Sequence, residues 1–267
     1  MKKCVVFLIV LALTAGLFAC KKPMQESIQA TSAPTTAPTI VPTQVPTAKP
    51  TEVPTEAPHS DLYVPGVSQD QMVTYFNEVV LSMEYTDGDG DATLVQKWEC
   101  PVRYRIEGVA DDGDAQVLDA FIEQLNEVEG FPGIGVATGL EQNVTISFLQ
   151  DEAFYAQFAD VLNGEVADGA VQFWYYNATN DIHSGRIGYR KDVSQEIRES
   201  VIPEEIVNLL GISDTVLRED SITYQYGNKA TKPSAVDWVI IKLLYHPRIQ
   251  CGMTAAECEP IIRELYY

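Results

Sequence analysis

Apolar residues recur at helical spacing in several parts of the chain after residue 60. Ser68 and Gln71 form a capping box, and the apolar positions that follow repeat with the period of one helix face. A second stripe ends at Gly130, a residue type that often follows the last turn of a helix. Ser234 begins another helix, which must stop before Pro247. The predicted helices cover residues 72–83, 114–129, 151–162 and 235–245, with two more around 204–211 and after Thr254.

Runs of alternating or β-branched residues between these helices predict strands. Asn180 and Asp181 are expected to form the turn of an antiparallel pair, whereas GFPGIG (130–135) has the composition of a loop. Pro203 and Pro260 fall inside two predicted helices, where proline normally marks the first turn or a kink. The order of elements predicts an α+β domain with one mixed β-sheet and packed helices. The predicted strands cover residues 94–98, 102–108, 143–149, 171–177 and 186–190.

The first twenty residues have the pattern of a secretion signal. Lys2 and Lys3 precede an apolar run over residues 4–15, which is too short for an ordinary membrane-spanning helix. The run leads into Leu-Phe-Ala-Cys, which resembles a bacterial lipobox; a plain signal peptide cleaved near Ala19 is the alternative. If the lipobox is used, Cys20 carries the lipid and holds the chain at the extracellular face of the bacterial cell membrane. The membrane is then a partner through this N-terminal lipid.

Prolines recur at every fourth position from Pro34 to Pro58, and most are followed by threonine. Neither a helix nor a sheet accepts this spacing, because each proline removes an N–H donor and fixes φ. Such a segment is a semi-rigid extended spacer of about 3.1 Å per residue. The sequence therefore predicts a lipoprotein signal peptide over 1–19, a Pro/Thr-rich extended tether over 20–59 and one globular domain over 60–267.

The predicted globular domain is strongly acidic. The first 59 residues hold five of the 18 Lys/Arg and three of the 38 Asp/Glu, so 13 and 35 remain and the net charge of residues 60–267 is −22. A field of this sign repels nucleic acid, so no nucleic-acid partner is expected. The acids are expected to keep the surface soluble, and attraction of cations is the alternative.

Three cysteines follow Cys20, an odd number that does not suit a disulfide scaffold. Cys251 and Cys258 are close enough in sequence to pair outside the cell, and the alternative is that they remain buried free thiols. Cys100 precedes Pro101 in a predicted β region, where a cysteine usually belongs to the core.

The segment EEIVNLLGISD (204–214) matches the zinc-protease pattern H-E-x-x-H-x-x-G-x-x-(H/D) at Glu205, Gly211 and Asp214. Glu204 and Asn208 stand where the pattern has histidines. In a working site, two histidines one helical turn apart hold zinc and the glutamate polarises the attacking water. Oxygen ligands suit Ca²⁺ or Mg²⁺ better, and three are too few for a strong calcium cage. The sequence therefore predicts no metal, no other cofactor and no assigned catalytic residue.

Four segments resemble the bacterial domain of unknown function family 2927: KWECPVRYRIEG, RESVIPEEIVNLLGISD, DSITYQ and AVDWVIIKLLYHPRIQCGMTAAECEPIIREL. The resemblance covers roughly residues 70–266. Asn208 stands where many members have glutamine, and Ser213 where asparagine is usual. The resemblance implies a zincin/metzincin-like fold whose metal positions are empty across the family, and no established activity.

These observations favour a surface-displayed, non-catalytic binding or structural module at the cell wall. An extended peptide or a cell-wall glycan would bind in a cleft beneath the 204–211 helix. The alternative is a peptidase-like hydrolase that uses Glu205 with a non-zinc or weakly held metal. A wall-spacing protein without a ligand is the third hypothesis. Acidic side chains in an open cleft would favour the hydrolase, and buried ones would favour the other two.

Overall fold

The computed structural model of the chain describes residues 60–81, 93–226 and 230–267. The chain divides into two compact units, Met1–Ala57 and Pro58–Tyr267, and every described residue belongs to the second. The predicted signal peptide, the lipidation site Cys20 and the tether lie outside the described residues, as does Met83 at the end of the first predicted helix. Within the described ranges, no helix combines the length and apolar character needed to cross a membrane.

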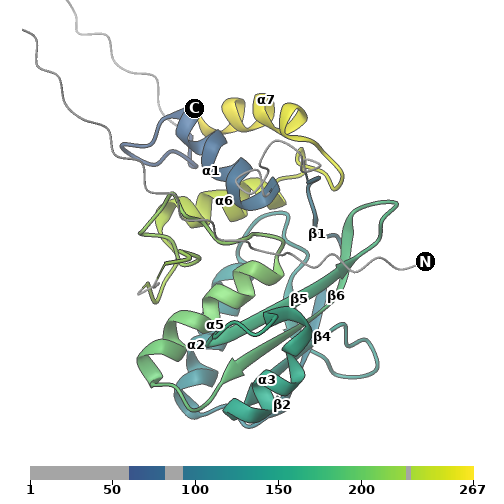
Figure 1. The fold of residues 1–267 in the computed structure, drawn as a ribbon. Coiled ribbons are helices and arrows are strands. Elements are labelled where there is room, and N and C mark those ends of the chain that lie inside the picture. The colour runs from purple at the N-terminus through teal and green to yellow at the C-terminus, as the bar shows by residue number, and fades with distance from the viewer. Residues whose placement is uncertain (1–59, 82–92, 227–229) are drawn as a thin grey trace, which may run out of the picture. The chain divides into compact units, whose positions relative to one another are not determined.

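The described part of the chain contains seven helices and six strands (Figure 1). The helices are α1 (Gln69–Leu81), α2 (Asp112–Asn126), α3 (Asp151–Gln157), α4 (Ala159–Leu162), α5 (Gln195–Leu209), α6 (Ala235–Tyr245) and α7 (Ala255–Tyr266). The strands are β1 (Lys97–Trp98), β2 (Val102–Gly108), β3 (Ile134–Val136), β4 (Val144–Leu149), β5 (Gly169–Tyr175) and β6 (Asp181–Arg190).

All six strands belong to one sheet. β6 pairs in parallel with β4 and, at its first residues, with β1. β2 pairs in parallel with both β4 and β3. Only β5 is antiparallel, paired with β6 along its whole length. The predicted mixed sheet is therefore confirmed, but its largely parallel pairing makes the domain mixed α/β rather than α+β.

One face of this sheet forms the main core. Strand residues alternate between faces, and the face that carries Tyr104, Ile146, Ile187 and Tyr189 is buried. Helices α2 and α5 pack together along this face, and α5 contacts both β5 and β6. Figure 1 shows α1, α6 and α7 gathered as a second group of helices beside this layer. The core that joins these layers is continuous.

The structure corrects three local predictions. The segment expected to be only a loop contains the short edge strand β3 over Ile134–Val136. The helix predicted over 151–162 is divided at Phe158, whose ring is fully buried. Helices α5 and α7 run through Pro203 and Pro260 in their interiors. Each proline removes one backbone hydrogen bond, but burial of an apolar helix face supplies most of the stability of such helices.

A buried ion pair joins the segment after α5 to the start of α6. Arg218 donates a hydrogen bond to Asp237, and both side chains are buried. Asp237 also accepts from the Ser221 hydroxyl at 2.7 Å and from the Ile222 backbone N–H at 3.0 Å. The same carboxylate completes the capping box of α6 with Ser234. The Asp-Ser-Ile and Asp-Trp segments therefore meet in one polar network that fixes the N-terminus of α6.

A second buried carboxylate fixes the other end of the same segment. Glu78 of α1 is buried and accepts hydrogen bonds from the Thr215 hydroxyl at 2.7 Å and from the Val216 N–H at 2.8 Å. Ser213 donates through its backbone N–H to the Val79 carbonyl at 2.7 Å. Residues 213–223 are thus tied to α1 at one end and to α6 at the other.

Replacing Asp237 with alanine should destabilise the domain by about 3–5 kcal/mol, because Arg218 would remain buried without its carboxylate. The free energy of unfolding in urea measures this loss. Asp220→Ala removes an exposed carboxylate from the same segment and should change stability by less than about 0.5 kcal/mol. Equal losses in the two variants would contradict the role of the Arg218–Asp237 pair.

Candidate functional site

The degenerate zinc-protease motif lies at the C-terminal end of α5. This helix begins at the N-cap Ser194, whose hydroxyl accepts from the Ile197 N–H. It ends at Leu209, and the turn that follows contains Gly211, which has φ +95° and where a side chain would collide with the Gln96 carbonyl oxygen. Glycine is required at this position because the backbone is left-handed and closely approached. The turn brings Asp214 back beside the helix.

Glu205 points from α5 onto the sheet instead of into an open cleft. A Cβ atom placed on Gly169 of β5 would lie 2.5 Å from the Glu205 Oε1 atom, so the missing side chain of this glycine makes room for the carboxyl group. Only 8% of Glu205 is exposed. Val201, one turn earlier on α5, covers the same glycine, and Leu209 lies over Gly185 of β6. The helix therefore approaches the sheet closely at two glycines, Gly169 and Gly185.

The surroundings of Glu205 favour its neutral form. Burial raises the pKa of the Glu205 carboxyl well above its usual value, and the nearby acids Glu204 and Asp214 raise this pKa further. Burial also raises the pKa of Asp214, against the opposing effect of its hydrogen bond from Asn208. The buried phenol of Tyr189 lies close enough for Glu205 and Glu204 to raise its pKa as well. A raised pKa is itself compatible with acid–base catalysis, so the observation against a general base here is the burial of Glu205 against the sheet.

Asn208 and Asp214, two positions that would hold metal in the complete motif, contact each other. The Asn208 Nδ2 atom donates to the Asp214 Oδ1 atom at 3.0 Å. The Oδ1 atom of Asn208 is buried and has no hydrogen-bond partner among the described residues. The turn after α5 thus brings these two motif residues together, and an amide–carboxylate hydrogen bond joins them.

Within the described ranges, no group of three or more His, Cys, Asp and Glu side chains is arranged to hold a metal ion. The two histidines of the domain lie elsewhere. The ring of His183 packs against Tyr176 with centroids 4.2 Å apart, and His246 accepts a hydrogen bond from the Arg248 N–H beyond the end of α6. Neither ring is placed to replace a missing ligand on α5.

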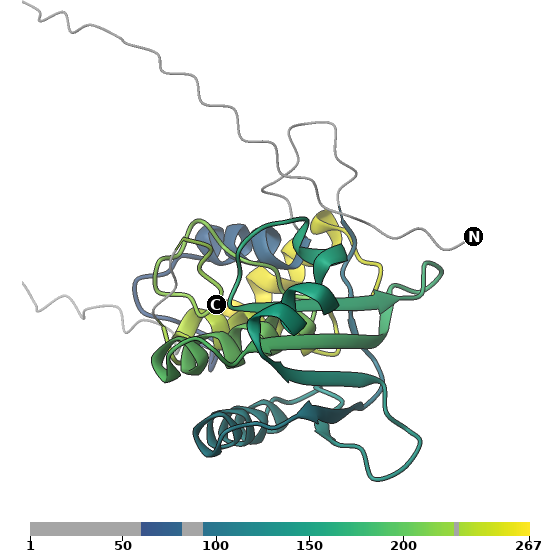
Figure 2. The ribbon, with the colours of Figure 1, turned by 60° about the horizontal axis from the view of Figure 1, so that its bottom comes forward.

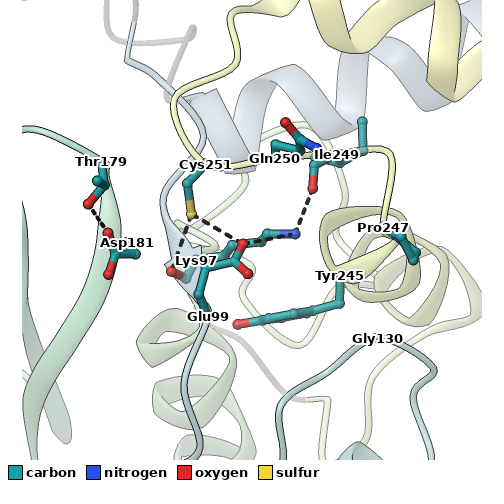
Figure 3. Close-up of a pocket in the computed structure, with 10 residues that line it drawn as sticks. All are labelled: Lys97, Glu99, Gly130, Thr179, Asp181, Tyr245, Pro247, Ile249, Gln250 and Cys251. Atoms are coloured by element: carbon teal, nitrogen blue, oxygen red, sulfur yellow. Dashed lines mark hydrogen bonds and ion pairs between the residues drawn. The ribbon is translucent and has the colours of Figure 1, made fainter.

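A pocket lies away from the motif, at the end of β1 (Figure 3). It has a volume of about 520 Å³. The buried Lys97 Nζ atom donates to the Ile249 carbonyl at 2.6 Å, lies 3.5 Å from Glu99 and sits over the Tyr245 ring. The Lys97 ammonium is therefore already bound by groups of the protein. The remaining lining comes from Gly130, Thr179, Asp181, Pro247, Gln250 and Cys251.

The cysteines are free thiols in the structure. Cys258 is buried in α7, whereas Cys251 lines the pocket, 3.6 Å from the Lys97 carbonyl oxygen. Burial raises the pKa of each thiol to about 11. The predicted bridge between them is not formed here and stays a prediction. Cys100 is exposed, so its expected place in the core was wrong, because the strand before Pro101 ends at Trp98.

The sequence pattern identified the motif residues on α5 but not the strand residues against which they pack. Gly169 and Tyr189 are directly paired across β5 and β6, and both lie under Glu205 or close to it. A glycine inside a strand was the available signal, because it often marks the close approach of another element.

Glu205→Gln should become more stable than the unchanged protein as pH rises. A glutamate in the unfolded chain ionises near 4.5, whereas folding raises the pKa of Glu205. Its stabilising contribution is therefore complete below 4.5 and is lost as pH rises toward the folded pKa. Urea midpoints between about pH 4 and pH 8 measure the difference.

The matched control for this experiment is Glu196→Gln, an exposed glutamate at the start of the same helix. Its pH profile should run parallel to that of the unchanged protein. Folding also raises the pKa of Asp214. Every variant should therefore still lose some stability as pH rises, and Glu205→Gln should lose less than the unchanged protein. Parallel profiles for Glu205→Gln and the unchanged protein would show that Glu205 ionises normally in the fold.

Comparison with known proteins identifies one family. The family described as "Protein of unknown function (DUF2927)" matches residues 69–264, a range that contains both α1 and the whole sheet. No curated protein matches the sequence. Because the match spans most of the chain, this protein belongs to the DUF2927 family.

Proposed function

We propose that this protein is a non-catalytic binding or structural module with a zincin-like domain, displayed at the outer surface of a bacterial cell. The domain would be held there by a lipid on Cys20 and spaced from the membrane by the Pro/Thr-rich segment up to residue 59. Its partners would be the membrane, through this lipid, and an extended peptide or a cell-wall glycan.

Two features support a zincin-like origin of the domain. The helix with the degenerate motif directly follows β6 of a mixed sheet, as the zinc helix of a zincin follows such a sheet. The turn at Gly211 then returns Asp214 to hydrogen-bonding distance of Asn208, 3.0 Å away. The last residue of the motif thus lies beside Asn208, which stands where the motif has its second histidine.

The observation that carries the non-catalytic role is the position of Glu205. The only residue that could polarise a water in this motif is seated against Gly169 of the sheet, and its pKa is raised. Neither of the two best-formed pockets of the described structure is lined by motif residues. This geometry disfavours the hydrolase hypothesis. It also disfavours the expected ligand site beneath α5.

The purified protein should therefore contain no stoichiometric zinc and should cleave no peptide library. The double change Glu204→His and Asn208→His should create zinc binding in the micromolar range or tighter, because both rings would leave one helix face beside Asp214. Metal analysis and calorimetry measure the two properties. Chelator-sensitive hydrolysis that is lost in Glu205→Gln would establish the hydrolase instead. A folded double variant that does not bind zinc would contradict the zincin analogy.

Lipid anchoring is tested by Cys20→Ala. The variant should appear in the culture medium, because a single thiol would carry the whole anchor. Cys100→Ala removes another thiol and should leave the protein with the membrane fraction. Fractionation followed by immunoblotting measures both distributions. Retention of Cys20→Ala in the membrane would contradict the lipoprotein hypothesis.

A further inference from the structure

The face of the sheet opposite α5 is covered at one end only. Phe158, between α3 and α4, lies against Gly188 of β6, and Gln157 donates to the Ser147 hydroxyl of β4 at 3.3 Å. Figure 2 shows β5 and β6 continuing beyond these short helices toward the turn that joins the two strands. The part of this face beyond Phe158 is here called the open face.

Strand register assigns the side chains of the open face. Gln172 of β5 is paired with Arg186 of β6, which is paired with Thr145 of β4, and Thr145 is paired with Arg105 of β2. These four residues therefore form one straight row across four strands. Three strand spacings of about 4.8 Å give this row a length of about 14 Å. A neighbouring row contains Trp174, its partner Ser184 and, on β2, Arg103.

This face carries two arginines, Arg103 and Arg105, that no described carboxylate neutralises. The guanidinium groups of Arg103 and Arg105 donate hydrogen bonds only to the backbone carbonyls of Val102 and Gly139. Neither makes an ion pair with a described carboxylate. Arg186, by contrast, is neutralised by both carboxylate oxygens of Asp160. Glu107 lies two residues beyond Arg105 on the same strand and is exposed. The guanidinium groups of Arg103 and Arg105 are thus available to an anionic group.

Exposed aromatic rings lie at the β5 end of this face, across the sheet from Arg103 and Arg105. The indole of Trp174 is 41% exposed and is held from below by the Arg186 guanidinium, which lies 5.9 Å from the Trp174 ring centroid and 5.0 Å from that of Phe158. Tyr176, two residues further along, is 55% exposed and packs on His183. Rigid aromatic rings offer a large contact area at little cost in conformational entropy.

We propose that the open face binds a glycan chain that carries carboxylate or phosphate groups. Trp174 would pack against the C–H face of a sugar ring, and Gln172, Thr145 and Ser184 would hydrogen-bond to hydroxyls. Arg103 and Arg105 would bind the acidic group through two parallel hydrogen bonds. This site rests on the proposed binding function and specifies its ligand, and it replaces the cleft expected beneath α5.

Charge density separates this ligand from nucleic acid. Duplex DNA carries one charge per about 1.7 Å, which the net charge of −22 would repel. Acidic glycans that carry about one charge per repeating unit place fewer anions near the protein than duplex DNA does. At physiological salt, charges further away than about 8 Å are largely screened, so the nearby arginines dominate at the open face.

The test measures binding of the full chain, purified in detergent, to polymers of defined chemistry. Polygalacturonate supplies carboxylates on sugar rings, and sugar-substituted poly(glycerol phosphate) supplies phosphates; dextran is the neutral sugar polymer and poly-glutamate the anion without sugar. Binding to at least one acidic glycan, and weaker binding to dextran and poly-glutamate, is the expected result. The acidic glycan that binds better identifies which anion the site prefers.

Variants locate the site. Arg103→Ala with Arg105→Ala, and separately Trp174→Ala, should each weaken binding at least about tenfold. Arg248→Ala with Arg263→Ala removes the same charge from exposed positions in another part of the domain and should not weaken binding. Trp174→Tyr, which keeps a flat ring, should restore most of the affinity. Thermal unfolding of each variant separates loss of the site from loss of the fold.

Three results would overturn the proposal: no binding to either acidic glycan, equal binding to poly-glutamate or dextran, and unchanged affinity in the open-face variants. The zinc and peptide-cleavage assays are made on the same preparation. Failure of the glycan experiment with no hydrolysis would remove this site and leave the non-catalytic role intact, whereas metal-dependent hydrolysis would remove the proposed function itself.

Discussion

The arrangement of the domain depends on the close approach of α5 to strands β5 and β6. Gly169 and Gly185 have no side chains on the face where Val201, Glu205 and Leu209 of the helix descend. This contact lets a helix with buried polar residues lie directly on the sheet. It also decides the chemistry of the degenerate motif, because Glu205 is pressed against a strand and desolvated. Water therefore reaches only a small part of this carboxyl group.

Buried carboxylates link the elements around this contact through hydrogen bonds and an ion pair. Asp237 holds Arg218, Ser221 and the start of α6, and Glu78 holds residues 215–216 against α1. Each carboxylate accepts several hydrogen bonds, which offset the cost of its burial. The segments that resemble the DUF2927 family thus include residues that fix the path of the chain after α5. Part of the family resemblance therefore reflects folding rather than a shared catalytic site.

Covering one face of the sheet with α2 and α5 leaves the other face for a different use. Among the described helices, only the short α3 and α4 lie on this face. Phe158, between them, packs against Gly188 of β6. Beyond Phe158, alternate residues of four strands are polar, charged or aromatic and lie at fixed spacings. A rigid sheet positions such side chains better than a loop does. This is the region where we place the glycan, and it lies across the sheet from the degenerate motif.

The sequence by itself determined most local structure. Helical periodicity and capping boxes located α1, α6 and the start of α7, and the turn at Asn180, with φ +62°, joined the predicted antiparallel pair. These signals are local, so they can be found without knowing the fold. The spacing of the motif also selected Asn208 and Asp214, which are in contact in the structure. It could not show that Glu205 is buried, because that depends on Gly169, a residue far away in sequence.

Tertiary structure alone decided three further features. Pro203 and Pro260 remain inside helices because packing compensates for one lost hydrogen bond in each. β3 became a strand because β2 offered a parallel edge to it, although its own composition indicates a loop. The row from Gln172 to Arg105 draws on four strands, and nothing in their separate sequences indicates that they align. Such a surface forms through pairing of strands that are far apart in the chain, so local sequence patterns do not predict it.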